Sequence, residues 1–410
     1  MYICLTQKYM SLLETIKEKS KEIFDEIVSI RRHLHMYPEL SFKEYETSKY
    51  IKSLLKNWNI SYTENIAENG IVVVISGDIE HKNDNCLNTI ALRADFDALP
   101  IEEETNLNFK SKNPGVMHAC GHDLHTASLL GVIKILNSLR HKFSGTIKFI
   151  FQPAEEMLPG GAAQMISQGV LKNPNVNIAL AQHVYTELDV GKVGFRKGQY
   201  MASTDEIYIN VEGQNGHAAI VEGTKNPISV ASQLVYELNS YFKKKKSNKH
   251  IFSIGDFISK GSTNIIPKTA KLKGTFRAMS EDFRKKSHEN IRRIVSVIEK
   301  ESNCKVFLEI RKGYPSLFND VEITQKTIDF AAKYLGEENV VELDERMTAE
   351  DFAYFSQKVP SCFYRLGVSN KHDKNRYGLH NSKFNPDEKS LLIGCGLMSW
   401  IAINHLNFQH

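Results

Sequence analysis

The stretch Met117-His118-Ala119-Cys120-Gly121-His122-Asp123-Leu124-His125 contains one thiol and three imidazoles within nine residues. It runs directly into apolar residues with helical spacing between Leu129 and Leu136, so the cluster is predicted to lie where a loop enters a helix. Thiolate and imidazole groups are both good ligands for zinc and related divalent ions. Buried structural histidines beside a free cysteine are the alternative. Four such donors at one junction favour a metal site.

The size and charge of the chain exclude several classes of protein. Its 410 residues are too many for one ordinary domain, so two domains are expected. Lys and Arg total 52 and Asp and Glu total 48, with both signs interspersed, so no basic surface for nucleic acid is expected. The longest apolar run, Leu391 to Ile403, is too short to span a bilayer, and the first ten residues lack a secretion signal. The six cysteines show no paired spacing, which is typical of the reducing cytoplasm.

Three apolar runs, at 89–92, 146–151 and 177–181, have the length and composition of buried strands, and polar side chains follow each of them. Helical patterns alternate with the strands, which predicts an α/β domain of three layers around a mainly parallel sheet. Ligands in such sheets gather beyond the carboxyl ends of the strands. The residues at these ends are Asp95, Glu155, Glu156 and His183. They are therefore expected to converge on Cys120 and His122.

Residues 200–313 have a different pattern. Strands and helices follow in the order βαββαβ, which is typical of a ferredoxin-like α+β unit. After residue 313 the chain returns to alternating helices and strands. We therefore predict a discontinuous catalytic, metal-binding domain at 1–199 and 314–410, with an inserted lid or dimerisation domain at 200–313.

Two further signals lie outside the predicted strands. Ser41-Phe42-Lys43-Glu44 has the capping-box pattern, in which the Ser and Glu side chains each satisfy a free amide at a helix start. His380 lies in the loop ahead of the last apolar helix, from where it can return to the cluster. Taken alone, a loop histidine is more often an ordinary surface residue.

With these residues aligned, the chain resembles the metal-dependent amidohydrolases of the aminoacylase and carboxypeptidase superfamily. The similar branch contains N-acyl-amino-acid amidohydrolases, hippurate hydrolases, auxin-conjugate hydrolases and N-acetyldiaminopimelate deacetylases. The likeness runs from Arg31-Arg32-His33-Leu34-His35 to Leu379-His380 and Phe384. The motifs that carry it are Arg93-Ala94-Asp95-Phe96-Asp97-Ala98-Leu99-Pro100, His118-Ala119-Cys120-Gly121-His122-Asp123 and Gln152-Pro153-Ala154-Glu155-Glu156.

The resemblance implies a centre of two divalent ions per chain, Mn, Zn, Co or Ni. Its ligands would be Cys120, His122, Glu156, His183 and His380. Glu155 would then be the general base, since it is the neighbour left without a metal. The resemblance also makes His217 the candidate donor to the oxyanion, and Asn264 and Arg277 the candidate substrate-binding residues. An Arg suits an α-carboxylate because its guanidinium binds both oxygens.

The function that the resemblance implies is hydrolysis of the amide bond of N-acyl-L-amino acids to a carboxylic acid and a free amino acid. The substrate would be a small molecule, and a homodimer or higher homo-oligomer is expected. Two alternatives stay open. One is a dipeptidase or carboxypeptidase of the same superfamily, and the other is a non-catalytic metal-binding or redox-sensing protein that uses Cys120 as its switch.

Overall fold

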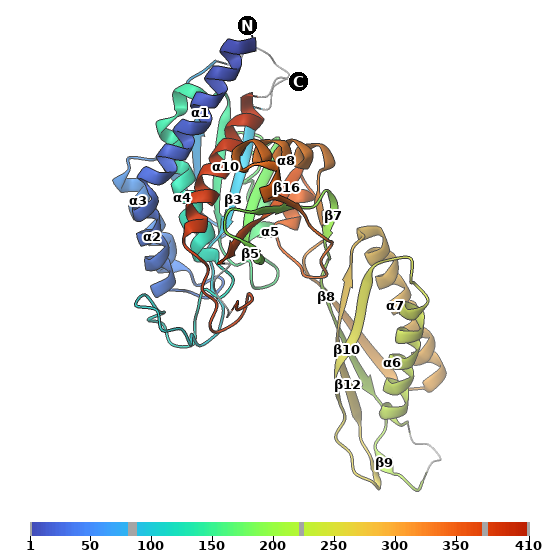
Figure 1. Ribbon diagram of the computed structural model, residues 1–410. Helices are drawn as coiled ribbons and strands as arrows, with labels where there is room; N and C mark the ends of the chain where they lie inside the picture. The colour runs from blue at the N-terminus through green and yellow to red at the C-terminus, as the bar shows by residue number, and fades with distance from the viewer. Residues whose placement is uncertain (1, 81–87, 221–224, 371–375, 408–410) are drawn as a thin grey trace. The chain divides into compact units, whose positions relative to one another are not determined.

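The computed structural model describes residues 2–80, 88–220, 225–370 and 376–407 (Figure 1). The chain divides into two compact units. The first contains Met1–Gly198, Phe318–Asp344 and Tyr354–His410, and the second contains Gln199–Leu317 and Glu345–Ala353. Among the described residues, none of the helices combines the length and apolar composition that crossing a bilayer requires.

The first unit is built on an eight-stranded, mainly parallel sheet with the order β1-β2-β4-β3-β5-β16-β6-β15. The central strands β4, β3, β5 and β16 run parallel, and their side chains are nearly all buried. This burial on both faces explains why the sequence shows continuous apolar runs there. The bounds are β1 Tyr62–Ile66, β2 Gly70–Ser76, β3 Thr89–Asp95, β4 Thr146–Gln152, β5 Ile178–Asp189, β6 Val193–Phe195, β15 Val340–Glu342 and β16 Ser361–Ser369.

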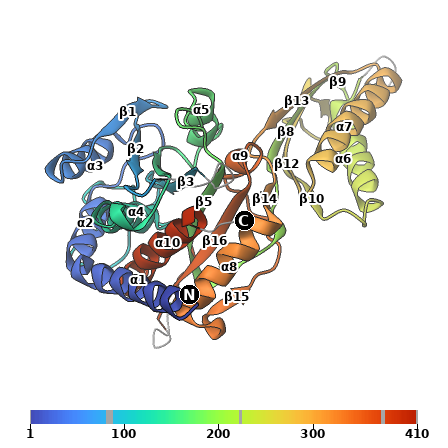
Figure 2. The same ribbon diagram turned by 90° about the horizontal axis from the view of Figure 1, so that it is seen from above.

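Helices cover both faces of this sheet. Figure 2 shows α4 and α10 on one side of β3 and α5 on the other. The connections from β3 to β4 and from β4 to β5 step along the sheet in opposite directions, so right-handed crossovers place α4 and α5 on opposite faces. Helix α10 also packs against α1 and α8, so the predicted three-layer α/β architecture is confirmed. The bounds are α1 Tyr2–Glu22, α2 Phe24–Met36, α3 Tyr45–Asn57, α4 His122–Ser138, α5 Gly161–Ser167, α8 Val321–Leu335, α9 Ala353–Ser356 and α10 Lys389–Asn407.

The second unit is an antiparallel sheet with the order β10-β12-β8-β13, packed against two helices through its own apolar core. Asn226 caps α6 by accepting from the Ile228 amide, and Ser280 caps α7 by accepting from the Phe283 amide. The bounds are β8 Asp205–Glu212, β9 Gly216–His217, α6 Pro227–Lys243, β10 His250–Ile258, β11 Ile265–Ile266, β12 Thr269–Ala278, α7 Glu281–Ser302 and β13 Lys305–Lys312. The chain crosses between the units after Gly198, Leu317, Asp344 and Ala353. Strands β7 Gly198–Met201 and β14 Leu317–Asn319 lie at the first two of these crossings.

One segment differs from the predicted domain boundaries. Glu345–Ala353 groups with the second unit and not with the first. The reason is its backbone bonding, because the Arg346 amide donates to Tyr200 O at 2.8 Å and Arg277 Nη1 donates to Met347 O at 3.0 Å.

The predicted capping box is wrong. Helix α3 begins at Tyr45, and neither Ser41 nor Glu44 caps it through its side chain. The carboxylate of Glu39 does so instead, because it accepts from the Glu46 and Thr47 amides at 3.2 and 2.8 Å. Ser41 and Glu44 bind other partners, Asp97 and Asn69.

Candidate metal centre

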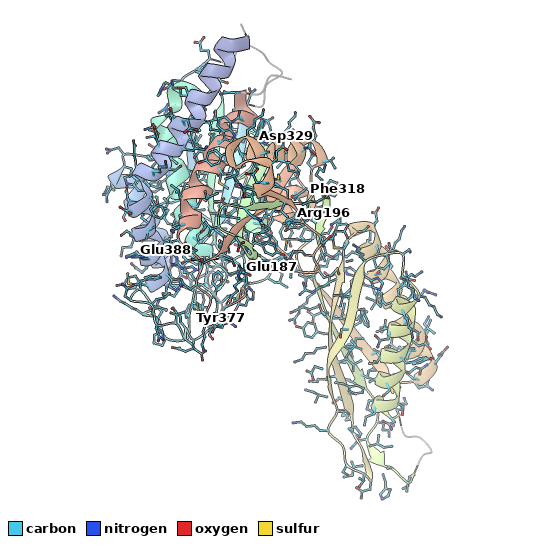
Figure 3. The ribbon with its side chains drawn as sticks, viewed as in Figure 1. Glu187, Arg196, Phe318, Asp329, Tyr377 and Glu388 are labelled. Atoms are coloured by element: carbon cyan, nitrogen blue, oxygen red, sulfur yellow. The ribbon has the colours of Figure 1, made fainter. Side chains whose placement is uncertain are left out.

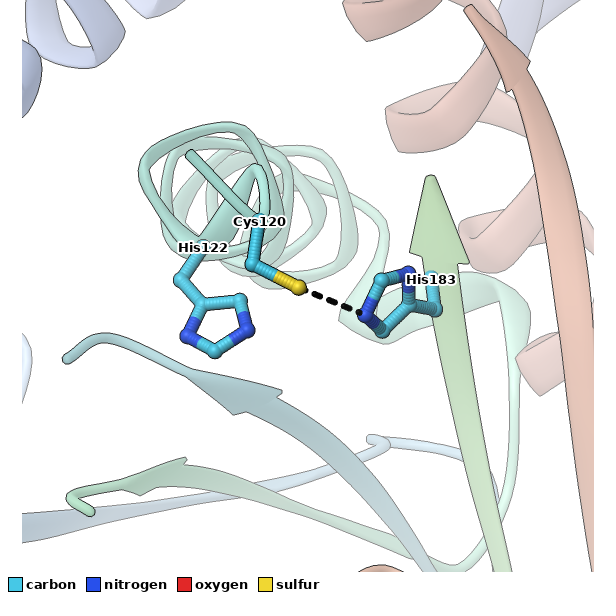
Figure 4. A group of neighbouring side chains, drawn as sticks. All are labelled: Cys120, His122 and His183. Atoms are coloured by element: carbon cyan, nitrogen blue, oxygen red, sulfur yellow. Dashed lines mark hydrogen bonds between the residues drawn. The ribbon is translucent and has the colours of Figure 1, made fainter. Parts of the chain in front are cut away.

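The close approach of α4 to β5 brings the thiol and imidazole cluster to the sheet. Gly121 precedes the helix with φ +84°, and a Cβ at this position would lie 2.6 Å from Val184 Cγ2. Only glycine satisfies both the left-handed backbone and the contact. Cys120 and His122 are the neighbours of this glycine in the sequence, so its close approach to Val184 brings them to His183 on β5 (Figure 4).

His183 is held in an orientation that suits a metal ligand. Its Nδ1 donates to Val184 O at 2.8 Å, which leaves the lone pair of Nε2 directed at Cys120 Sγ, 3.6 Å away. Burial, followed by the nearby Arg365 and His125 charges, holds the pKa of His183 well below its usual range. The imidazole is thus neutral, which is the form that binds metals.

His122 is held in the same way. Its Nδ1 lies 2.9 Å from Asp97 O and 3.2 Å from Asp97 Oδ1. Nε2 is buried and has no hydrogen-bond partner among the described residues, although Glu156 Oε1 lies 3.9 Å away. Burial alone would lower the pKa of His122, but Asp95 and Asp97 raise it to about 10. A cation fits this site, since it would replace the proton on Nε2 and bind the neighbouring carboxylate as well.

Cys120 lies among acidic groups. Burial, then Glu156 and Glu155, raise the pKa of its thiol well above the usual range. A thiolate in this position therefore needs a nearby cation, and binding of that cation would release the thiol proton.

The loop that carries His380 returns to the cluster from the end of the chain. The His380 amide donates to Ala119 O at 2.8 Å, and the Glu104 amide donates to Ser382 O at 2.8 Å. His380 has φ +62°, a backbone conformation that is uncommon for a residue with a side chain. It brings Nε2 to 3.3 Å from Glu156 Oε1.

All six predicted residues of the first unit meet in one place. Their ligand atoms form three overlapping groups, and within each group the atoms lie within 4.8 Å of one another. These groups are Cys120 with His122 and His183, Cys120 with Glu156 and His380, and His122 with Glu155 and Glu156. Because Cys120, His122 and Glu156 each belong to two groups, the arrangement has the donors for two adjacent ions.

Asp97 is a residue of this site to which the sequence analysis assigned no role. Its Oδ2 accepts from Ser41 Oγ at 2.6 Å and from the Glu156 amide at 2.9 Å, while its other oxygens face His122. Burial would raise the pKa of Asp97, but the His122 bond lowers it below the usual range. The available signal was the carboxylate two residues beyond Asp95, at the carboxyl end of a buried strand.

Another imidazole of the opening stretch, His125, lies beside the cluster but is already hydrogen-bonded. Its Nδ1 bonds Asp95 Oδ1 at 2.6 Å and its Nε2 accepts from the Val184 amide at 2.9 Å, so both nitrogens are used. Arg93 Nη1 in turn bonds Asp95 at 2.5 Å. Asp95, expected to join the cluster, therefore fixes the tautomer of His125 beside it.

A second buried network, formed with residues of α2, fixes the start of α4. Arg31 Nε donates to Asp123 Oδ2 at 2.7 Å, and His35 Nδ1 lies 2.9 Å from the same oxygen. Arg31 Nη1 also donates to Glu388 Oε1 at 3.2 Å. Glu388, labelled in Figure 3, lies just ahead of α10. The motif at 31–35 thus links α2, α4 and the residue ahead of α10 around Asp123, which follows His122.

The other three predicted residues belong to the second unit. His217 and Asn264 are exposed neighbours, because His217 pairs with Ile265 and the Ala218 amide donates to Asn264 O at 3.0 Å. Arg277 is half-buried on β12, and burial lowers its pKa. The structure thus places the ligand candidates and Glu155 in one unit and these three residues in the other.

Comparison with known proteins agrees with this site. Residues 91–403 match Peptidase family M20/M25/M40. Thermostable carboxypeptidase 1 of Saccharolobus solfataricus is 37% identical over 404 residues, which cover 97% of this chain and 100% of the relative. N-acetyldiaminopimelate deacetylase of Bacillus subtilis is 35% identical over 378 residues, which cover 92% and 97%.

Among solved structures, the Bacillus subtilis YXEP protein, a dinuclear metal binding peptidase from the M20 family, superposes with a TM-score of 0.79. The two chains are 32% identical, and the match covers 94% of this chain and 99% of the other. Sequence and fold therefore agree over nearly the full length, and this chain belongs to peptidase family M20/M25/M40.

Proposed function

We propose that this protein is a dinuclear metal-dependent amidohydrolase that cleaves N-acyl-L-amino acids to a carboxylic acid and a free amino acid. The observation that supports it most is the meeting of Cys120, His122, Glu156, His183 and His380 beside a second glutamate. The family membership and the deacetylase relative support the same reaction class.

In this proposal the five clustered side chains hold two divalent ions and leave Glu155 for proton transfer. When bound, the ions lower the pKa of a water molecule and polarise the scissile carbonyl. Glu155 takes a proton from the attacking water and returns it to the departing amine. Asp97 and Val184 accept from Nδ1 of His122 and His183, so both rings are oriented with Nε2 towards the other donors before an ion arrives. An ion at His122 would displace the proton that its raised pKa retains.

The residues of the second unit would act on the substrate. His217 is proposed to donate to the oxyanion that forms on the attacked carbonyl. Arg277 and Asn264 are proposed to bind the substrate, with the guanidinium on the α-carboxylate. The partly lost hydration of Arg277, which lowers its pKa, strengthens its attraction for such an anion.

A carboxypeptidase or dipeptidase is the second candidate, because a carboxypeptidase is 37% identical to this chain. Both reactions break an amide beside a free α-carboxylate, so the same ions and the same glutamate serve either one. The two reactions differ in the group that supplies the carbonyl of the cleaved amide, which is a simple acyl group for the amidohydrolase and an amino-acid residue for the peptidase.

A substrate panel tests the proposal. The protein is loaded with Mn, Co, Zn or Ni and given acetyl- and benzoyl-amino acids together with dipeptides of the same carboxyl-terminal residues. Faster release of amino acid from the acyl compounds supports the amidohydrolase, and faster cleavage of dipeptides supports the peptidase. No turnover in protein that holds two ions would favour a non-catalytic metal or redox sensor.

We also propose that the protein forms a homodimer through its second unit. Strand β10 lies at the edge of the four-stranded sheet, and its residues Ile251, Phe257 and Ile258 are about 40% exposed or more. An exposed apolar edge strand tends to pair with another chain. Light scattering coupled to gel filtration measures the mass, and a monomer at micromolar concentration would contradict this assembly.

A further inference from the structure

We propose that Ser41 and Glu44 are positioning residues that hold the turn Ala154–Glu155–Glu156 from both of its ends. The inference rests on the proposed function, since it takes Glu155 as the base and Glu156 as a metal ligand. It assigns a role in the reaction to a segment that lies about 110 residues before this turn and outside the ligand set.

Glu44 holds the first end of the turn. Its Oε1 accepts from the Ala154 amide at 2.8 Å, and its Oε2 accepts from Asn69 Nδ2 at 2.9 Å. Ala154 has φ +53°, a left-handed conformation that costs free energy for any residue with a Cβ. The Gly161 amide donates to Ala154 O at 2.9 Å. The strained residue immediately before Glu155 is therefore fixed at both its amide and its carbonyl.

Ser41 holds the other end through Asp97. Its Oγ donates to Asp97 Oδ2 at 2.6 Å, and the same oxygen accepts from the Glu156 amide at 2.9 Å. The hydroxyl fixes the carboxylate, and the carboxylate fixes the backbone of Glu156. The two residues at either end of Glu155 are thus tied to one short segment before α3.

Stability of α3 alone does not explain why Glu44 is buried. The first amides of that helix are already satisfied by Glu39. Glu44 is fully buried, and burial followed by the charge of Asp97 raises its pKa to about 7. Burying a carboxyl group near another one is costly. This cost is reasonable at a position that fixes reacting groups, where small displacements lower the rate strongly.

Four variants test the proposal: Glu44→Ala, Glu44→Gln, Ser41→Ala and Glu39→Ala. The last is the matched control, since it removes the cap of α3 but none of the bonds to the turn. For each variant we would measure kcat, KM and the melting temperature. The electronic spectrum of the protein loaded with Co²⁺ is a readout that does not depend on turnover.

For Glu44→Ala we expect kcat to fall by roughly 10- to 100-fold, the usual effect of losing a group that orients ligands. Two Co²⁺ ions should still bind, with an altered spectrum because Glu156 is displaced. Glu44→Gln should recover most of kcat. The oxygen of the Gln side chain can accept from the Ala154 amide, and the side-chain amide of Asn69 can rotate so that its oxygen accepts from the Gln nitrogen. Glu39→Ala should melt at a lower temperature with wild-type kcat and spectrum.

The proposal is overturned if Glu44→Ala keeps wild-type kcat and spectrum, or if Glu39→Ala loses as much kcat for the same loss of melting temperature. If Glu44→Ala does not fold, Ser41→Ala is the deciding variant. We expect its kcat to fall by about 10-fold, and an unchanged kcat would overturn the proposal. If the wild-type protein hydrolyses nothing, the proposed function fails. The Co²⁺ spectra of the variants then still show whether the turn is held.

Discussion

Replacement of Asp97 by alanine is the perturbation that reaches most of the site at once. The side chain accepts from Ser41 Oγ, from the Glu156 amide and from His122 Nδ1. Asp97→Ala removes all three bonds. The main-chain oxygen of residue 97 remains 2.9 Å from His122 Nδ1, so the orientation of that ring is partly preserved.

The expected magnitude follows from these contacts. Loss of an outer partner of a metal ligand lowers metal affinity by about 10- to 100-fold. Because His122 keeps one of its two contacts, the loss should lie near the lower end, about 10-fold or ~1.4 kcal/mol. The Ser41 hydroxyl and Glu156 amide lose their buried acceptor, which costs about 1–3 kcal/mol each in the stability of the metal-free chain.

Competition with a chromophoric chelator measures the affinity, and thermal unfolding of the metal-free protein measures the stability. Asp97→Asn is the matched control, since it preserves the side-chain volume and one acceptor oxygen. It should lose less metal affinity and less stability than Asp97→Ala. The reasoning would be refuted by an Asp97→Ala protein that binds both ions with wild-type affinity.

Three further changes give separate expected results. Glu155→Gln should abolish turnover and retain two ions by elemental analysis; loss of metal would mean that the two glutamates have the opposite roles. His217→Ala should lower kcat by on the order of 100-fold, and an unchanged kcat would remove it from the reaction. Asp205→Ala should destabilise the second unit by about 3–5 kcal/mol, because it leaves Arg284 and His288 without their buried acceptor. Burial alone would raise the pKa of Asp205, but these two partners hold it below its usual range. The stabilisation is therefore present above about pH 4 and is lost as the pH falls further, so urea unfolding of wild type and variant should converge there.

The sequence predicts the second unit closely because its strands alternate in polarity. The order βαββαβ predicted for residues 200–313 is found as β8, α6, β10, β12, α7 and β13. Strands β1 and β15 were missed, because they are short, lie at the edges of the large sheet and have little apolar pattern. The capping box failed for a different reason. Ser41 and Glu44 satisfy the local rule, but distant partners bind them more strongly.

The candidate site is predictable where the sequence places donors next to secondary structure. Cys120, His122 and Glu156 are found in this way. His380 is not, since its position depends on a bond to Ala119, about 260 residues earlier, which no local pattern reveals. The sequence shows Asp97 only as a carboxylate beyond a strand end, and the bonds by which it supports the site, which join distant segments, emerge from the structure.

The central claim is that donors from distant parts of the chain hold two cations beside Glu155. Anomalous scattering from crystals of the protein loaded with zinc or manganese tests it most directly. We predict two peaks per chain among Cys120, His122, Glu156, His183 and His380. A single peak, or peaks bound by other residues such as Asp95 and His125, would contradict the account.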